Sequence, residues 1–343
     1  MMNGKEIAEL NAETLGKLKA LLEAPKKITV VSHANPDGDA IGSGLGWTRF
    51  LEKLGHEVMF VVPNYFPSFL NWMEGIEKVR IFKRDAEAVT PFIAASELVC
   101  CLDLNDVKRL EGLSDIIFHS PTPRVLIDHH LSPPDDYALS FSNTTASSTA
   151  YLVYKVIEGM GLETEVDRAV AESLLVGITT DTGNFAFGNL TPDLFRVVGS
   201  LVDQGVDLPR MNMAVYNNFS ENRMRLMGYA LDRKMETVPG CDAACIWLDQ
   251  AELKRYKFEP GDTEGFVNLP LAIGRIGMSA LFVETLDCIK VSLRSQGEID
   301  VNLFARKHFN GGGHKNASGG KFFGPMDEAL ATFRAAVTTE FSA

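Results

Sequence analysis

The stretch VVSHANPDGDAIGSG, residues 30–44, decides the fold prediction. It begins with the last valines of an apolar, β-branched run. His33, Asp37 and Asp39 then follow within seven residues, around a Pro-Asp-Gly turn. Spaced glycines then lead into a segment with helical periodicity that ends at Leu54. A strand, a polar turn and a helix in this order are typical of parallel α/β sheets, which bind ligands beyond the carboxyl ends of their strands.

The alternation of strand and helix continues through the first 200 residues. Four short runs are hydrophobic at nearly every position, as strands covered by helices on both faces are. They span residues 28–33, 56–63, 97–103 and 124–130. Three further segments have helical periodicity or capping residues, at 40–54, 147–161 and 166–183. We therefore predict a doubly wound α/β domain with a parallel sheet.

A second domain is expected because 343 residues exceed one ordinary hydrophobic core. The segments AACIWLD, MSALFVET, CIKVSLRS and EIDVNLFA predict a smaller α/β domain with a mixed sheet. The stretch around MNMAVYNNFSEN is typical of a connector. We expect a catalytic domain at 1–204, a linker at 205–222 and a substrate-binding domain at 223–343, with the active site in the cleft between the two domains.

The composition is that of a soluble globular protein, with 45% hydrophobic and 23% charged residues. The sequence contains no run of eighteen apolar residues, which is the pattern that predicts a membrane span. The N-terminal segment lacks the apolar region of a signal peptide. The five cysteines are scattered and fit neither a disulfide framework nor a zinc site. We expect a cytoplasmic protein without a membrane partner.

The net charge of −12 is unevenly distributed. Residues 1–220 carry 18 basic and 29 acidic side chains, whereas residues 221–343 carry 15 and 16. Binding of long nucleic acids needs a basic surface, so long duplex nucleic acid is not an expected partner. An acidic first domain is instead suited to holding cations.

Polar side chains gather where the predicted strands end. Asp103 closes one strand, and Asp128, His129 and His130 close the next. With the three polar residues after the first strand, they bring four carboxylates and three imidazoles to one edge of the sheet. Divalent cations would relieve the repulsion among these carboxylates. The mixture of ligands suits Mn²⁺ best, with Mg²⁺, Co²⁺ and Zn²⁺ as alternatives.

Four motifs in this order, HANPDGDAIGSG, CLDLND, IDHH and GITTDTG, resemble those of the DHH phosphoesterase family. VSLRS and FNGGGHKNASGG (309–320) resemble the first subtype of DHH-associated domain. Together the two resemblances cover most of the chain. Within the family, the chain resembles the group of bifunctional oligoribonucleases, or nanoRNases, that also act as pAp phosphatases.

The resemblance implies a site for two metal ions. His33 and Asp37 would bind one ion, Asp39, His129 and Asp181 would bind the other, and Asp103 would bridge them. Asp128 would accept a hydrogen bond and orient an imidazole, and His130 would contact the substrate phosphate. The implied catalytic residues are therefore Asp37, Asp39, Asp103, Asp128, His129, His130 and Asp181.

The resemblance also implies that the second domain binds the substrate. Arg294, Ser295 and His314 would hold its nucleotide end. The glycines Gly311, Gly312 and Gly313 would let the backbone approach a phosphate or a base closely.

The function implied is metal-dependent hydrolysis of phosphoesters by a two-metal mechanism. Expected substrates are oligoribonucleotides of two to five nucleotides and the 3′-phosphate of adenosine 3′,5′-bisphosphate (pAp). Alternatives are a phosphodiesterase for linear or cyclic dinucleotides, an exopolyphosphatase-like hydrolase and, outside the enzymes, a nucleotide sensor. The expected partners are thus short oligonucleotides or small nucleotides, and a homodimer is left open.

Overall fold

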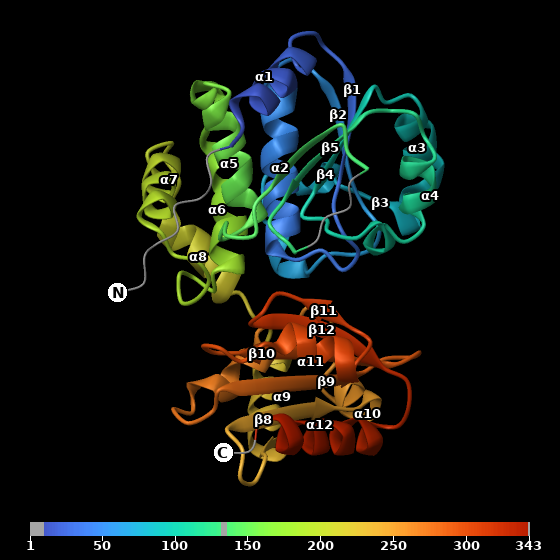
Figure 1. The fold of residues 1–343 in the computed structure, drawn as a ribbon, viewed down its shortest axis with the longest axis vertical. Helices are drawn as coiled ribbons and strands as arrows, with labels where there is room; N and C mark the ends of the chain where they lie inside the picture. Colours follow the sequence, from blue (N-terminus) through green and yellow to red (C-terminus); the bar gives the residue numbers. More distant parts are fainter. Residues whose placement is uncertain (1–9, 132–135, 342–343) are drawn as a thin grey trace. The chain divides into compact units, whose positions relative to one another are not determined.

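The chain divides into two compact units in a computed structural model, which describes residues 10–131 and 136–341. The first unit ends at Asn218 and the second begins at Phe219. Each unit is built on one sheet with helices packed against it (Figure 1).

The described part of the first unit contains a six-stranded sheet in the order β3-β2-β1-β4-β5-β6, and every pairing in it is parallel. The strands are β1 (Lys27–Val31), β2 (Glu57–Val62), β3 (Arg80–Ile81), β4 (Leu98–Leu102), β5 (Arg124–Asp128) and β6 (Leu139–Ser142). The chain proceeds from β1 to one edge and then from β4 to the other. The switch point for ligand binding therefore lies between β1 and β4.

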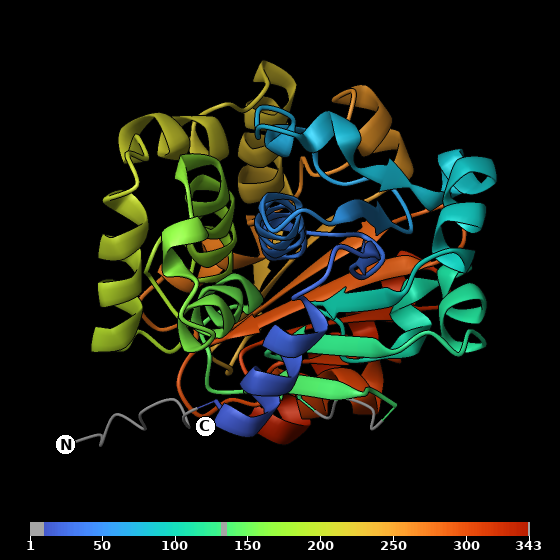
Figure 2. The ribbon, with the colours of Figure 1, turned by 90° about the horizontal axis from the view of Figure 1, so that it is seen from above.

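Helices cover both faces of this sheet. The α-helices of the first unit, within the described residues, are α1 (Ala12–Leu21), α2 (Gly38–Lys53), α3 (Phe82–Ala94), α4 (Leu113–Phe118), α5 (Thr149–Gly159), α6 (Arg168–Asp181), α7 (Pro192–Val202) and α8 (Leu208–Tyr216). Helices α2, α5 and α6 lie together on one side, and α3 and α4 lie on the other (Figure 1). Figure 2 shows α2 almost end-on, with α5 and α6 beside it. The predicted doubly wound domain is confirmed.

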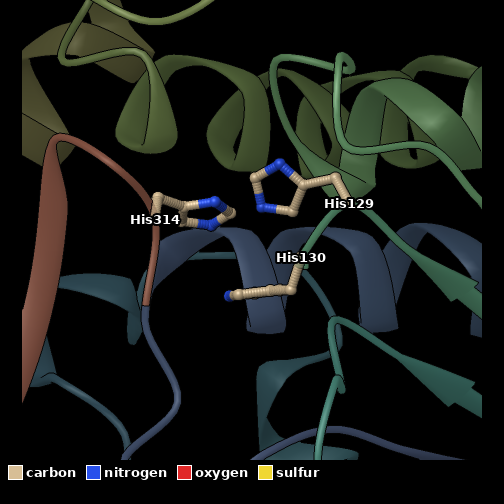
Figure 3. A group of neighbouring side chains, drawn as sticks. All are labelled: His129, His130 and His314. Atoms are coloured by element: carbon tan, nitrogen blue, oxygen red, sulfur yellow. The ribbon is translucent and has the colours of Figure 1, made fainter. Parts of the chain in front are cut away.

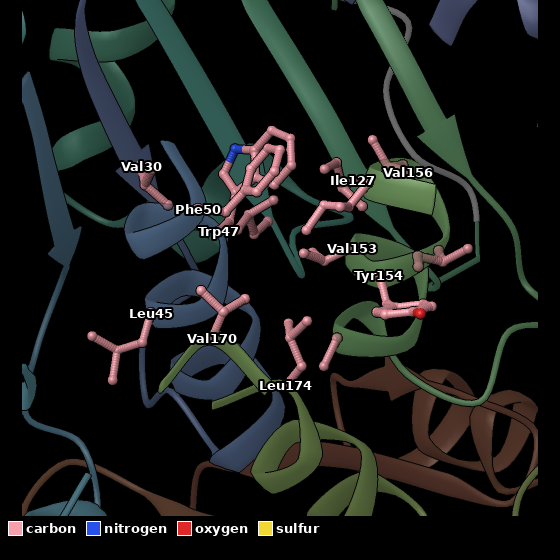
Figure 4. Packing of buried hydrophobic residues seen from close by; sticks show 14 of the residues in the cluster. Val30, Leu45, Trp47, Phe50, Ile127, Val153, Tyr154, Val156, Val170 and Leu174 are labelled. Carbon is pink, nitrogen blue, oxygen red and sulfur yellow. The ribbon is translucent and has the colours of Figure 1, made fainter. Parts of the chain in front are cut away.

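The main core of the first unit lies between the sheet and α2, α5 and α6. The rings of Trp47 and Phe50 stack there with centroids 5.2 Å apart (Figure 4). Helices α2 and α6 approach closely because glycines face each other. A Cβ on Gly42 would lie 2.6 Å from the backbone nitrogen of Gly177. This contact sets the distance between two helices whose ends carry predicted metal ligands.

Part of the range predicted as a linker is a helix of the first unit. Helix α8 occupies Leu208–Tyr216, and its Met211 and Val215 are buried in the core of that unit. Asp207 caps the helix by accepting a hydrogen bond from the amide of Arg210. The stretch around MNMAVYNNFSEN predicted a connector, but two apolar residues four apart, Met211 and Val215, bury one helical face there.

The second unit contains a six-stranded sheet, within the described residues, in the order β11-β12-β10-β9-β8-β7. Its strands are β7 (Met235–Thr237), β8 (Ala243–Leu248), β9 (Met278–Glu284), β10 (Ile289–Ser295), β11 (Gly312–Gly313) and β12 (Ala317–Phe322). Its helices are α9 (Glu221–Arg233), α10 (Gln250–Arg255), α11 (Val301–His308) and α12 (Met326–Phe341). The β8–β9 pairing is parallel and the others are antiparallel, which confirms the predicted mixed sheet.

Most of the apolar segments noted in the second unit are strands, but EIDVNLFA leads into helix α11. Asp300 caps this helix by accepting hydrogen bonds from the amides of Asn302 and Leu303. Across both units, no helix in the described part of the chain has the length and apolarity that a membrane span needs.

Candidate active site

The ends of β1, β4 and β5 bring the predicted metal ligands together in the first unit. Two groups of three residues lie side by side, and within each group the ligand atoms all lie within 4.8 Å of one another. The groups are His33, Asp37 and Asp103, and Asp39, His129 and Asp181. This division matches the two sets of ligands that the family resemblance implies. The role of each residue as a ligand stays a prediction.

His33 is a buried imidazole with one nitrogen anchored and the other directed at carboxylates. Its Nδ1 lies 2.9 Å from the carbonyl oxygen of Ala34, an acceptor that fixes the proton on Nδ1. Its Nε2 lies 3.2 Å from Asp103 Oδ2 and 4.0 Å from Asp37 Oδ2. Asp37 caps α2 through Oδ1, which accepts from the amides of Asp39 and Ala40. The second oxygen of Asp37 is therefore the one that faces His33.

His129 repeats this arrangement in the other group. Its Nδ1 lies 3.3 Å from the carbonyl oxygen of Ala146. Its Nε2 lies 3.5 Å from Asp181 Oδ2, 3.7 Å from Asp103 Oδ1 and 3.8 Å from Asp39 Oδ2. Anchoring of one imidazole nitrogen by a carbonyl leaves the other as a ligand, which is the usual arrangement around protein-bound metals.

Asp103 lies at the centre of the cluster. It follows β4 with a positive φ of 55°, a conformation that aspartate tolerates better than most residues. Burial opposes its ionisation, but the imidazoles of His130, His33 and His129 hold the pKa of Asp103 well below its ordinary value. Asp103 therefore keeps its negative charge and is within reach of both groups.

Asp39 shows that the cluster has too much negative charge for its own residues to balance. Burial, together with repulsion from Asp103, Asp181 and Asp37, raises the pKa of Asp39 well above its ordinary value. Both Asp39 oxygens are nevertheless held in place, because they accept hydrogen bonds from the amides of Thr149 and Ala150 at the start of α5. The carboxylates and anchored imidazoles fit divalent cations, which would remove this repulsion.

His130 has a different environment from its neighbour. Figure 3 shows the side chains of His129 and His130, which follow β5. The centroids of their rings lie 4.9 Å apart, at an interplanar angle of 74°. Nδ1 of His130 lies 2.8 Å from Oδ1 of the fully buried Asp128, and Nε2 lies 3.4 Å from Nη1 of Arg109. The imidazole that Asp128 contacts is therefore that of His130, and the role of Asp128 in the reaction stays a prediction.

Three residues around the cluster were not predicted from the sequence. The hydroxyl of Thr149 donates to Asp103, and Arg109 donates to both His130 and Asn105. Thr149 directly follows the two serines that predicted a helix start, and Ser148 is the residue that caps α5. Asn105 belongs to the CLDLND motif, so its position was a signal that could have been used.

The substrate-binding residues predicted in the second unit lie around one hairpin. Arg294 on β10 pairs with Ala317 on β12, and the amide of His314 donates to the carbonyl of Ala317. Arg294 also donates to the carbonyl of Leu293. Ser295 is 8% exposed, and its hydroxyl donates to the carbonyl of Ile299. The internal bond gives Ser295 a structural role, and its contact with substrate stays a prediction.

Two of the three glycines before His314 are required by packing within the second unit. A Cβ on Gly311 would lie 1.9 Å from the carbonyl oxygen of Gly319. Gly313 has a φ of 148°, which side chains rarely adopt, and its Cβ would lie 2.7 Å from the carbonyl oxygen of Ala317. Gly312 pairs with Gly319 in the sheet. Close contact with β12 therefore explains Gly311 and Gly313, whereas a Cβ on Gly312 would first meet Oδ1 of Asn302, at 3.3 Å. An approach of these glycines to substrate remains a prediction.

Comparison with known proteins identifies the family. The family model described as "DHH family, N-terminal domain" matches residues 27–178, and the DHHA1 domain matches residues 250–343. The bifunctional oligoribonuclease and PAP phosphatase NrnA of Thermus thermophilus is 31% identical over 95% of this chain and 92% of its own length. The chain belongs to the DHH family. It is thus a hydrolase that acts on phosphoester bonds, as the motifs predicted.

Other DHH proteins support the same assignment. NrnA of Bacillus subtilis is 29% identical over 87% of this chain and 89% of its own. An exopolyphosphatase-related protein from Bacteroides fragilis, known from a crystal structure, has 39% sequence identity and a TM-score of 0.92. The match covers 98% of this chain and 97% of that one. Membership in the DHH family and the geometry of the cluster together imply divalent metal ions at this site.

Proposed function

We propose that this DHH hydrolase degrades oligoribonucleotides of two to five nucleotides and removes the 3′-phosphate of pAp, with two divalent cations, preferably Mn²⁺. The observation that carries the proposal is the meeting of two ligand groups at Asp103. Similarity to NrnA from two bacteria over about nine-tenths of the chain supports the choice of substrates.

The residues of the first unit have distinct parts in this reaction. His33 and Asp37, with Asp103, would hold one cation, and Asp39, His129 and Asp181 would hold the other. Cations bound there lower the pKa of water and offset the charge that develops in phosphoryl displacement. The amides at the start of α5 and the hydroxyl of Thr149 keep Asp39 and Asp103 oriented for this purpose.

The second unit, which contains the DHHA1 match, is proposed to bind the nucleotide end of the substrate. Arg294 offers a planar guanidinium for a phosphate, and His314 offers a second donor near it on the neighbouring hairpin. Neither residue is among the ligands assigned above to the two cations, so we assign them to substrate affinity and not to the chemical step.

A panel of substrates tests the proposal. Purified protein with Mn²⁺ is incubated with pAp, pApA, cyclic di-AMP, polyphosphate and a twenty-nucleotide RNA, and initial rates are compared. The proposal requires that pAp and pApA give the highest kcat/KM. A preference for cyclic di-AMP or for polyphosphate would replace it with one of the two enzymatic alternatives. Binding of pAp without hydrolysis of any substrate would indicate a sensor.

A further inference from the structure

Arg109 places a permanent positive charge next to the metal cluster of the first unit. The residue lies in a short 3₁₀ segment, Val107–Leu110, six positions after Asp103. Its side chain is partly buried, and Nη1 donates to Oδ1 of Asn105 at 3.1 Å. Its carbonyl oxygen accepts from the amide of Ala34 at 2.7 Å, which fixes the segment to the turn after β1. Both ends of Arg109 are therefore held in place.

The contact with His130 defines which groups can bind an anion. A guanidinium only donates hydrogen bonds, so Nη1 of Arg109, 3.4 Å away, makes Nε2 of His130 the acceptor. Nδ1 of the same ring donates to Asp128. Both nitrogens of His130 are engaged in this arrangement, whereas the guanidinium of Arg109 has five N–H groups, more than these two contacts use.

The charge balance of the cluster leads to the same residue. Within the described residues, the ligand groups and the histidine beside them include five carboxylates, those of Asp37, Asp39, Asp103, Asp128 and Asp181. Two divalent cations balance four of these charges, and Arg109 supplies the fifth positive charge. A neutral site can accept a phosphoester anion, whereas a negative one would repel it.

We propose that Arg109 is a substrate-binding residue that donates hydrogen bonds to a non-bridging oxygen of the scissile phosphate. Asn105 and His130 position its guanidinium, whose planar fork matches two phosphate oxygens. The proposal rests on phosphoester hydrolysis by the DHH site and on two bound cations. It does not depend on which nucleotide the enzyme prefers, because every substrate considered carries this phosphate.

The test measures phosphate affinity directly, without turnover. Binding of inorganic phosphate to the manganese-loaded protein is followed by calorimetry for the wild type, Arg109→Met and Arg109→Lys, and manganese per chain is measured by elemental analysis. Lys108→Met is the matched control, since it removes one positive charge from an exposed neighbour in the same segment. Hydrolysis of bis-p-nitrophenyl phosphate gives KM and kcat for an ester without a nucleoside.

Arg109→Met is expected to weaken phosphate binding at least tenfold and to raise KM, with manganese content unchanged. Arg109→Lys should recover part of the affinity, Asn105→Ala should weaken binding less than Arg109→Met, and Lys108→Met should behave as wild type. Unchanged phosphate affinity in Arg109→Met overturns the proposal. Loss of manganese in that variant also overturns it, because Arg109 would then support the metal cluster. A wrong nucleotide preference in the substrate panel leaves these results unaffected.

Discussion

Thr149 donates its hydroxyl to Oδ1 of Asp103 at 2.8 Å and its backbone amide to Oδ2 of Asp39 at 2.7 Å. One residue in the first turn of α5 thus orients two carboxylates that come from different strand ends. Groups that orient metal ligands in this way typically change metal affinity by about 10- to 100-fold when they are mutated.

Substitution of Thr149 tests this support. Thr149→Val keeps the shape of the side chain but removes the donor to Asp103, so we expect manganese affinity to fall by about 10- to 100-fold. Thr149→Ser keeps the hydroxyl and is the matched control. Affinities are measured by titration with manganese. Equal affinity in the valine variant and the wild type would show that the hydroxyl has no part in metal binding.

Helix packing and the site are linked at Gly177. A Cβ there would lie 2.5 Å from Cβ of Ala150 and 2.8 Å from Oδ1 of Asp39. Gly177→Ala is therefore expected to destabilise the protein by about 1–3 kcal/mol through overpacking and to weaken manganese binding. Denaturant unfolding and metal titration measure the two effects.

Gly199 provides the control for the change from glycine to alanine. It lies in α7 with no atom within 4 Å of its Cβ position. Gly199→Ala should stabilise the protein by about 0.5–1 kcal/mol, because alanine favours the helix, and should leave metal affinity unchanged. If both alanine variants stabilise the protein, then α2 and α6 are not as tightly packed as Gly177 indicates.

The architecture of the first unit was predictable because β1, β2, β4 and β5 are largely apolar and several of its helices have clear ends. The two-residue strands β3 and β11 were not predicted, since two residues carry no periodicity. Helix α8 was taken for a linker because only Met211 and Val215 mark its buried face. Helix α11 was hard to predict for a similar reason. A capping residue such as Asp300, followed by an apolar run, is hard to distinguish in the sequence from a loop that leads into a strand.

The ligands of the cluster were predictable because they occur at strand ends, where parallel sheets bind ligands. Asp181 required the family resemblance, since it ends a helix 51 residues after His130. Thr149 and Arg109 were missed because their side chains reach the site only through the packing of α5 and of the loop after β4. Ser295 has an internal hydrogen bond, which its position next to Arg294 in the sequence does not reveal.

His314→Ala should separate nucleotide recognition from chemistry. Loss of one charge-assisted contact costs roughly 1.5–3 kcal/mol, so kcat/KM for pAp and pApA should fall by about 10- to 100-fold. Bis-p-nitrophenyl phosphate should be hydrolysed nearly as before. The matched control is His308→Ala, whose imidazole instead contacts Glu340 at 2.7 Å. Equal losses on the nucleotides and on the small ester would assign His314 to catalysis or folding.

Substrate length should be limited by charge. Neither part of the chain has an excess of basic residues, so phosphates far from the site gain few contacts. We expect kcat/KM to be highest at two to four nucleotides and to fall by about tenfold or more at twenty. A change from about 50 to 200 mM salt should alter the rate on short substrates only modestly. A twenty-nucleotide RNA that is the better substrate, with a steep salt dependence, would contradict this prediction.

The number of manganese ions bound per chain, measured in the wild type and in Asp103→Ala, tests the central claim most directly. The account predicts two tightly bound ions in the wild type. In Asp103→Ala it predicts loss of bound manganese together with a decrease in kcat of at least about a thousandfold. Circular dichroism verifies that the variant is folded. Two tightly bound ions in folded Asp103→Ala would contradict the assignment of Asp103 as the residue that both ions share.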